Sequence, residues 1–230
     1  MAAMARARPH KVPPQTSKSN HTGMRLFIAL DIDDAIRERI ARFLEGVRAF
    51  APEARWVREE SLHVTLKFIG EQAPEFVASL KNVLDRVPVP PFAIAFRGFG
   101  FFPTPKSPRV FWARIQAGPE LQRLAGAADN ATAQLGVPKE QHAFSPHLTL
   151  ARKSGASGAP HRDQAERPGT AFQRLQEKLA AMPAPDFGTM TAREFFLYQS
   201  QLSRTGSRYT KLERFALAEE ARAAADPHNS

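Results

Sequence analysis

The chain of 230 residues contains no cysteine. This absence excludes disulfide frameworks, thiolate metal sites, iron–sulfur clusters and cysteine nucleophiles. No apolar run approaches the roughly 20 residues needed to cross a bilayer, and the N-terminus lacks the apolar segment of a secretory signal. We therefore expect a cytoplasmic protein without a membrane partner.

Acidic residues are fewer than basic ones. The chain has 23 Asp and Glu against 32 Lys and Arg, which gives a formal net charge of +9 at pH 7. A basic surface concentrates phosphate-bearing ligands, so this balance favours an anionic partner. Residues 1–23 hold four of the basic side chains and no acid, and we expect them to form a disordered tail. A tail that only aids solubility is the alternative explanation of that part of the charge.

Hydrophobic periodicity predicts one ordered domain at 24–218, followed by a polar tail at 219–230. Strands are expected at 25–31, 62–69, 92–99, 109–115, 144–152, 193–199 and 209–217. Amphipathic helices are expected near 36–47, 76–87, 121–135 and 172–182. The acids at 31, 33 and 34 are expected to cap the first of these helices.

Two segments are expected to be irregular. The proline-rich stretch at 102–108 predicts a rigid loop at the tip of a hairpin, because prolines interrupt a ladder. Residues 153–169 have almost no large apolar side chain, which predicts a flexible excursion. The remaining pattern is coarsely symmetric, since each half has strands, one or two helices and one His-x-Thr strand. It favours an α+β fold of two similar lobes over a parallel βαβ sheet.

The repeated His-x-Thr motif carries the chemical information. His63 and Thr65 are two residues apart in a strand pattern, and so are His147 and Thr149. Side chains at that spacing point to the same face of a strand. If the two strands face each other across a cleft, two imidazoles and two hydroxyls converge on a volume that suits a phosphate.

These residue types suit the hydrolysis of a cyclic phosphodiester. The reaction needs a base for the attacking water and an acid for the leaving ribose oxygen. Imidazole titrates near about 6.5, so one histidine can be neutral while the other is protonated. Threonine hydroxyls can donate to the non-bridging oxygens, where negative charge accumulates. This chemistry requires no metal. A single His-x-Thr is more often structural, so the hypothesis depends on the repetition.

Other side chains are weighed for substrate binding. Arg152 is the local candidate for a phosphate-binding cation, although strict alternation places it on the strand face opposite His147. Phe27, Trp112 and Tyr209 lie near the proposed cleft strands, where a nucleobase can stack on an exposed ring. By contrast, Phe68 is assigned to the core.

The order of longer segments indicates a family. RLFIALD at 25–31, SLHVTLKFIGE at 61–71, RVFWARI at 109–115, FSPHLTLAR at 144–152 and SRYTKLERFAL at 207–217 follow one another along the chain. Together they resemble the 2H phosphoesterase superfamily, and within it the RNA 2′,3′-cyclic phosphodiesterases, also called 2′-5′ RNA ligases. The resemblance covers about residues 25 to 217.

The resemblance implies a bilobal α+β fold with pseudo-twofold symmetry. Each lobe would be an antiparallel sheet with helices on its outer face, and a cleft would lie between the lobes. His63 would be the proton donor and His147 the proton acceptor. Thr65, Thr149 and Arg152 would bind the phosphate. The resemblance also implies that no metal or cofactor takes part, that the product is a 2′-phosphate, and that RNA ends or cyclic nucleotides are the substrate. We expect the protein to be a monomer.

Three alternatives stay open. Ligation of 2′-5′ RNA uses the same groups, with an RNA hydroxyl in place of water. Other superfamily members act on ADP-ribose cyclic phosphates or 2′-5′ linked oligonucleotides. A non-catalytic RNA-binding module would use the positive charge alone.

Overall fold

The computed structural model of the chain describes residues 23–154, 172–203 and 206–218. The tail expected at 219–230, residues 1–22 of the N-terminal tail and nearly all of the excursion expected at 153–169 lie outside these described residues. None of the helices in the described segments is both long and apolar enough to cross a membrane.

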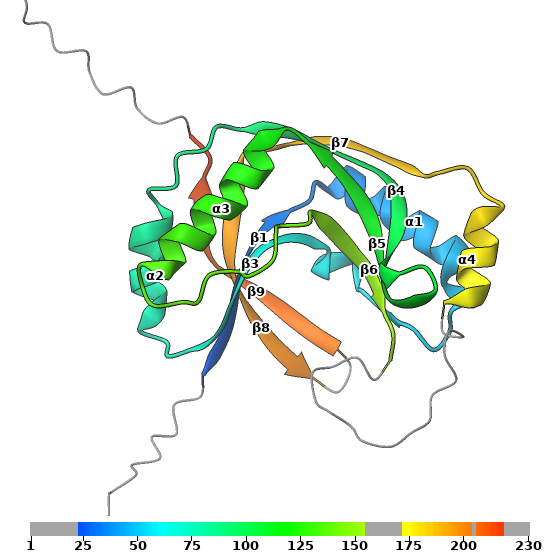
Figure 1. Cartoon of the computed structure of the whole chain (residues 1–230), viewed down its shortest axis with the longest axis horizontal. Helices are drawn as coiled ribbons and strands as arrows, with labels where there is room; N and C mark the ends of the chain where they lie inside the picture. The colour runs from blue at the N-terminus through cyan, green and yellow to red at the C-terminus, as the bar shows by residue number, and fades with distance from the viewer. Residues whose placement is uncertain (1–22, 155–171, 204–205, 219–230) are drawn as a thin grey trace, which may run out of the picture.

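The described residues form two antiparallel sheets (Figure 1). The first sheet has the order β3 (His63–Gln72), β1 (Met24–Asp31), β8 (Glu194–Ser203), β9 (Gly206–Ala216). The second has the order β2 (Arg55–Trp56), β6 (His147–Arg152), β5 (Ser107–Ala117), β4 (Phe92–Thr104), β7 (Asp186–Ala192). One His-x-Thr motif therefore lies in each sheet, which confirms the expected α+β class with two antiparallel sheets.

Helices cover the outer sides of the two sheets. The described helices are α1 (Asp34–Val47), α2 (Phe76–Leu84), α3 (Pro119–Ala133) and α4 (Gln173–Ala180). Figure 1 shows α2 and α3 on one side of the molecule and α1 and α4 on the other. The helix α1 follows β1 of the first sheet but packs on β7 of the second, while α3 follows β5 but packs on β3. Each half of the chain thus contributes to both lobes.

Alternation along the strands separates the main core from a second face. In β1, Leu26, Ile28 and Leu30 belong to the main core, whereas Phe27 and Ala29 join Phe196 and Tyr198 in a small cluster on the opposite side. We call the side of each sheet that is turned away from the main core its cleft face. The small cluster therefore forms part of the cleft face of the first sheet.

The proline-rich stretch is not a loop. Strands β4 and β5 stay paired up to Thr104 and Ser107, so the prediction of an irregular tip at 102–108 is wrong. Pro103 and Pro108 lie opposite each other beside a register shift. Their missing N–H groups therefore fall at one position of the ladder, where a shift already interrupts pairing. The prediction also missed β2, which is very short, and β7.

Both motif strands contain the same irregularity. In β3 the pairing with β1 skips Leu66, and in β6 the pairing with β5 skips Leu150. Each skipped residue is a bulge, where one strand has an extra residue and the alternation of side chains is reset. Each leucine is the third residue after its histidine, so the bulges sit at equivalent positions of the two motifs.

Candidate active site

His63 is the first residue of β3 and lies opposite Asp31 of β1. Its Nδ1 donates a hydrogen bond to the backbone oxygen of Ser61 at 2.7 Å, because a carbonyl can only accept. Its ring lies on that of Phe27, with centroids 4.9 Å apart, and meets the Tyr209 ring edge-on at 5.0 Å. Because the proton of the neutral ring is on Nδ1, the Nε2 atom keeps its lone pair and can accept a proton.

His147 repeats this arrangement at the start of β6. Its Nδ1 donates to the backbone oxygen of Ser145 at 2.8 Å, again two residues upstream. Phe102 meets the imidazole edge-on at 5.1 Å, and Trp112 does so at 6.2 Å. The two histidines therefore have the same tautomer and the same kind of aromatic support.

The two motif strands lie next to each other although they belong to different sheets. Burial is the main cause that lowers the pKa of His63 to about 4, and the positive charges of Arg152 and His147 lower it further. Burial and the charge of Arg152 also lower the pKa of His147 below its ordinary value of 6.5. Both imidazoles are therefore neutral at pH 7 in the unliganded protein.

The bulges decide which side chains share the cleft face with the histidines. In β6 both Leu150 and Ala151 face the core, so Arg152 returns to the side of His147 and Thr149. The Nη2 atom of Arg152 lies 3.5 Å from Oγ1 of Thr149. The expected placement of Arg152 on the opposite face is thus wrong, because a bulge interrupts the alternation.

In β3 the same bulge exchanges the expected positions of Lys67 and Phe68. Lys67 is 2% exposed and faces the core, whereas Phe68 is 57% exposed and follows Thr65 on the cleft face. The assignment of Phe68 to the core is wrong for this reason. Phe68 and Arg152 each lie five residues after their histidine, so one motif ends in an aromatic ring and the other in a cation.

An ionic network next to His63 was missed by the sequence analysis. Asp31 accepts hydrogen bonds from Lys211 and, at 2.7 Å, from Arg37. Burial alone would raise the pKa of Asp31, but the hydrogen bonds from Lys211 and the Ile32 amide, with the nearby positive charges, lower it. Asp31 thus does not cap α1, whose N-cap residue is Asp33. The sequence feature that could have indicated this role is the position of Asp31 at the end of the strand that pairs with the first motif strand.

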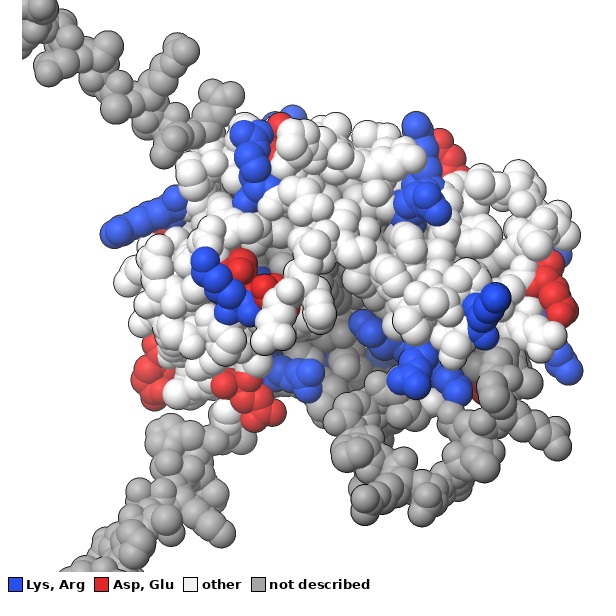
Figure 2. Space-filling model, in the orientation of Figure 1, with Lys and Arg blue, Asp and Glu red and all other residues white. Residues whose placement is uncertain are grey.

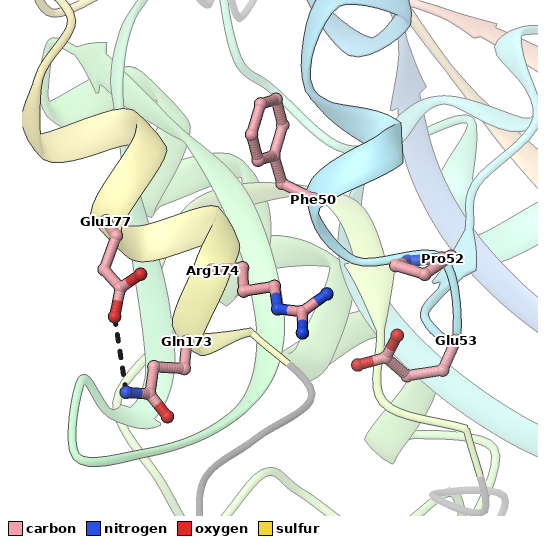
Figure 3. Close-up of a pocket in the computed structure, with 6 residues that line it drawn as sticks. All are labelled: Phe50, Pro52, Glu53, Gln173, Arg174 and Glu177. Carbon is pink, nitrogen blue, oxygen red and sulfur yellow. Dashed lines mark hydrogen bonds between the residues drawn. The ribbon is translucent and has the colours of Figure 1, made fainter.

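One face of the molecule is hollowed. Figure 2 shows a hollow near the centre of the molecule, with Lys and Arg side chains along its lower edge. A separate cavity of about 460 Å³ lies between α4 and the turn at 48–50, where Arg174 and Glu53 extend toward each other (Figure 3). None of the site residues expected from the sequence lines that cavity. Among the described residues, no group of three His, Asp or Glu is placed to hold a metal ion.

Comparison with known proteins identifies the family. Residues 30–112 match the family model of the LigT like phosphoesterases. An RNA 2′,3′-cyclic phosphodiesterase of Archaeoglobus fulgidus is 35% identical over 198 residues, which cover 84% of this chain and 99% of that protein. The chain belongs to the LigT-like phosphoesterase family.

Other LigT-like phosphoesterases extend this finding to the fold. The RNA 2′,3′-cyclic phosphodiesterase of Escherichia coli is 30% identical over 198 residues, 85% of this chain and 97% of that protein. The structure of E. coli LigT with 3′-AMP matches 86% of this chain and 99% of its own, with a TM-score of 0.66 and 30% identity. A protein of Thermus thermophilus matches 86% of this chain and 100% of its own, with a TM-score of 0.67 and 30% identity. The resemblance to the 2H phosphoesterases is confirmed.

The three aromatic residues considered for base stacking differ in this LigT-like site. Phe27 is 2% exposed, and its ring contacts His63, Tyr198 and Tyr209, so little of its surface is available to a base. Trp112 is partly buried and stacks on Phe102 at 4.8 Å. Tyr209 is partly buried beside His63. Stacking of a nucleobase on Trp112 or Tyr209 stays a prediction.

Proposed function

We propose that this LigT-like phosphoesterase hydrolyses RNA 2′,3′-cyclic phosphodiester ends to 2′-phosphomonoesters, with His63 and His147 as the acid and base. The observation that carries the proposal is the paired geometry of the two imidazoles. Each is held by its Nδ1 on a serine carbonyl, and each has Nε2 free of that bond for proton transfer. Relatives that align over nearly their whole length are named RNA 2′,3′-cyclic phosphodiesterase, which supports the choice of substrate.

The two histidines supply the proton transfers of the reaction. One Nε2 accepts a proton from water as the water oxygen bonds to phosphorus, and the other gives a proton to the ribose O3′ as the P–O3′ bond breaks. The net change is the addition of one water molecule. Following the family pattern, His63 is the donor and His147 the acceptor.

Three side chains stabilise the phosphate in this proposal. Thr65 and Thr149 share the cleft faces with the histidines, and their hydroxyls can donate to non-bridging oxygens. Arg152 adds a guanidinium near Thr149. Its charge reaches both histidines, since it lowers the pKa of each. Arg152 therefore lies close enough to act on a phosphate held between them.

The low pKa of both histidines adds a condition to the mechanism. A donor must be protonated, yet burial holds the pKa of His63 at about 4 in the unliganded protein. A bound phosphodiester carries a negative charge, which favours the imidazolium form and raises the pKa of a nearby histidine. We infer that the donor takes up its proton together with the substrate.

Alternative activities differ in substrate or in the attacking group. Ligation of 2′-5′ RNA replaces water by an RNA hydroxyl, and another cyclic or 2′-5′ linked nucleotide would use the same four motif residues. A non-catalytic RNA-binding module would leave the proton-transfer geometry without a purpose. We also expect a cytoplasmic monomer, which light scattering for the single-chain mass and cell fractionation would test.

Product analysis tests the proposal. The full chain is incubated, in EDTA, with a nucleoside 2′,3′-cyclic phosphate and with a trinucleotide that ends in one. We expect both to be converted to 2′-phosphates, which chromatography separates from the 3′ isomers. A 3′-phosphate product, or no turnover of either substrate, would contradict the proposed reaction. Joining of added RNA 5′-hydroxyl ends would favour the ligase alternative.

A further inference from the structure

Two arginines lie directly opposite each other at the edge of the second sheet. Arg55 of β2 pairs with Arg152 of β6, and side chains of directly opposed residues extend from the same face of a sheet. The next residue, Trp56, packs edge-on against Phe111 in the core at 6.1 Å. Arg55 therefore extends from the cleft face, beside Arg152.

This pair of like charges has no counter-charge in the described part of the chain. Like charges directly opposite each other destabilise a ladder. Neither guanidinium has an ion pair with a described carboxylate, and the polar contact of Arg152 is with Thr149. Elsewhere on the same surface the pattern is different, since Arg37 and Lys211 share Asp31. An arrangement of two adjacent, uncompensated arginines is suited to bind an anion that comes from outside the protein.

The position of Arg55 distinguishes it from Arg152. Arg152 reaches back toward Thr149 and influences both histidines, whereas Arg55 lies one strand farther out, at a spacing of about 4.8 Å. In the proposed function, Arg152 binds the phosphate that lies between the two histidines. Figure 2 shows Lys and Arg side chains gathered along the lower edge of the hollow, and Figure 1, in the same orientation, shows β6 ending in the lower central part of the molecule.

We propose that Arg55 binds the phosphodiester that precedes the terminal nucleotide, so that the protein prefers an oligonucleotide end to a mononucleotide. This subsite rests on the proposed function, because it is defined relative to the phosphate at the histidines. The ligand is a single-stranded nucleic acid with at least two phosphate groups. The planar guanidinium of Arg55 matches the two non-bridging oxygens of such a phosphodiester.

The test compares substrates of two lengths in the full chain. Turnover is measured for Arg55→Gln and for wild type, with a nucleoside 2′,3′-cyclic phosphate and with a trinucleotide ending in the same group. We expect kcat/KM for the trinucleotide to fall about tenfold, the typical effect of one charge-assisted hydrogen bond, and that for the mononucleotide to fall less than twofold. The matched control is Arg86→Gln, an exposed arginine after α2, which should change neither value.

Two results would overturn the subsite. An equal loss for both substrates would place Arg55 at the reacting phosphate, and no loss for either would leave it without a role. Failure of the proposed function is separate, because wild type would then turn over neither substrate. In that case the subsite is tested by the binding of a trinucleotide 2′-phosphate, which is measured by fluorescence anisotropy at several salt concentrations. Arg55→Gln should weaken binding and reduce the slope of log K against log salt by about 0.7, and an unchanged slope would refute the subsite.

Discussion

His63 and His147 are held in the same way, and both are partly buried. In both, Nδ1 donates a hydrogen bond to the backbone oxygen of a serine two residues upstream, and both rings contact aromatic rings. The pKa of His63 is lowered to about 4, while that of His147 is lowered by the same causes. In the unliganded protein both rings are therefore harder to protonate than a free imidazole. In the proposed mechanism the donor role of His63 depends on the charge of the substrate.

The pH dependence of kcat/KM follows from these pKa values. Activity needs one proton on the pair, so it declines below the lower macroscopic pKa, where no base remains, and above the higher one, where no acid remains. Both pKa values are lowered below 6.5. We expect kcat/KM for a nucleoside 2′,3′-cyclic phosphate, measured from pH 4 to 8, to peak below pH 6.5 and to decline toward pH 8.

A profile that stays flat or rises between pH 6.5 and 8 would contradict this account of the histidines. It would mean that the acid has a pKa above 6.5 in the free protein. Because kcat/KM reports the free protein, a higher optimum of kcat alone would instead agree with a pKa raised by bound substrate.

At this scale the sequence predicted the motif residues and mispredicted their neighbours. Alternation placed His63 and Thr65 on one face correctly because no bulge lies between them. Beyond the bulges it failed for Arg152, Lys67 and Phe68. A bulge leaves no mark in a pattern of alternating hydrophobic residues, since the extra residue is itself a leucine in both strands.

At the scale of elements, Lys67 connects the first motif strand to the segment that leads into the second. Its Nζ lies 2.6 Å from a carboxylate oxygen of Asp129 in α3 and donates to the backbone oxygen of Pro138 at 2.7 Å. Asp129 also accepts the amide of Glu140. Farther along, Gln122 of α3 donates to the Phe144 backbone oxygen, three residues before His147. The helix α3 thus holds the approach to β6 against β3.

Replacing Lys67 by Met tests this connection. The substitution keeps an unbranched side chain but removes the buried ammonium and leaves Asp129 without its partner. Loss of one member of a buried pair costs about 3 kcal/mol of unfolding free energy. We expect a loss of that order in urea denaturation.

Two comparisons complete this test. The Lys67→Met/Asp129→Leu double variant should recover part of the loss, because the Asp129 carboxylate is removed as well and the other partner of Lys67, Glu140, is half exposed. Lys81→Met, at an ion pair with Glu213 where the lysine is about half exposed, should change the unfolding free energy far less. A similar loss in Lys67→Met and Lys81→Met would show that burial of the ion pair has no special role.

At the scale of the whole molecule, the two-lobed arrangement that the sequence predicted is present. Each lobe, however, is built from segments of both halves of the chain. Two lobes follow from two motif strands and a repeated strand and helix pattern. The order of the strands could not be predicted, because β8 and β9 return from the end of the chain to complete the first sheet. Helix α1 follows a strand of the first sheet but packs on β7 of the second, and α3 follows a strand of the second but packs on β3 of the first. These are contacts between distant segments, on which local periodicity gives no information.

The two motif strands differ at the residue that follows the bulge on the cleft face. The equivalent positions after the two bulges hold Phe68 in one lobe and Arg152 in the other. The two motifs therefore differ in chemistry at this position, with an aromatic ring in one and a guanidinium in the other. In the proposed function this difference would give a bound nucleotide a preferred direction, because a base stacks on an aromatic ring while a phosphate pairs with a guanidinium.

The most direct test of the account is the turnover of a trinucleotide 2′,3′-cyclic phosphate by His63→Ala and His147→Ala, with His142→Ala as the matched control. His142 is an exposed histidine in the segment before β6. Removing a general acid or base typically lowers the rate about 10²- to 10⁴-fold. We predict a loss of about 10³-fold in kcat for each motif variant, with near-wild-type activity for His142→Ala and an unchanged circular dichroism spectrum for all three. Activity within tenfold of wild type in either motif variant would contradict the two-histidine mechanism.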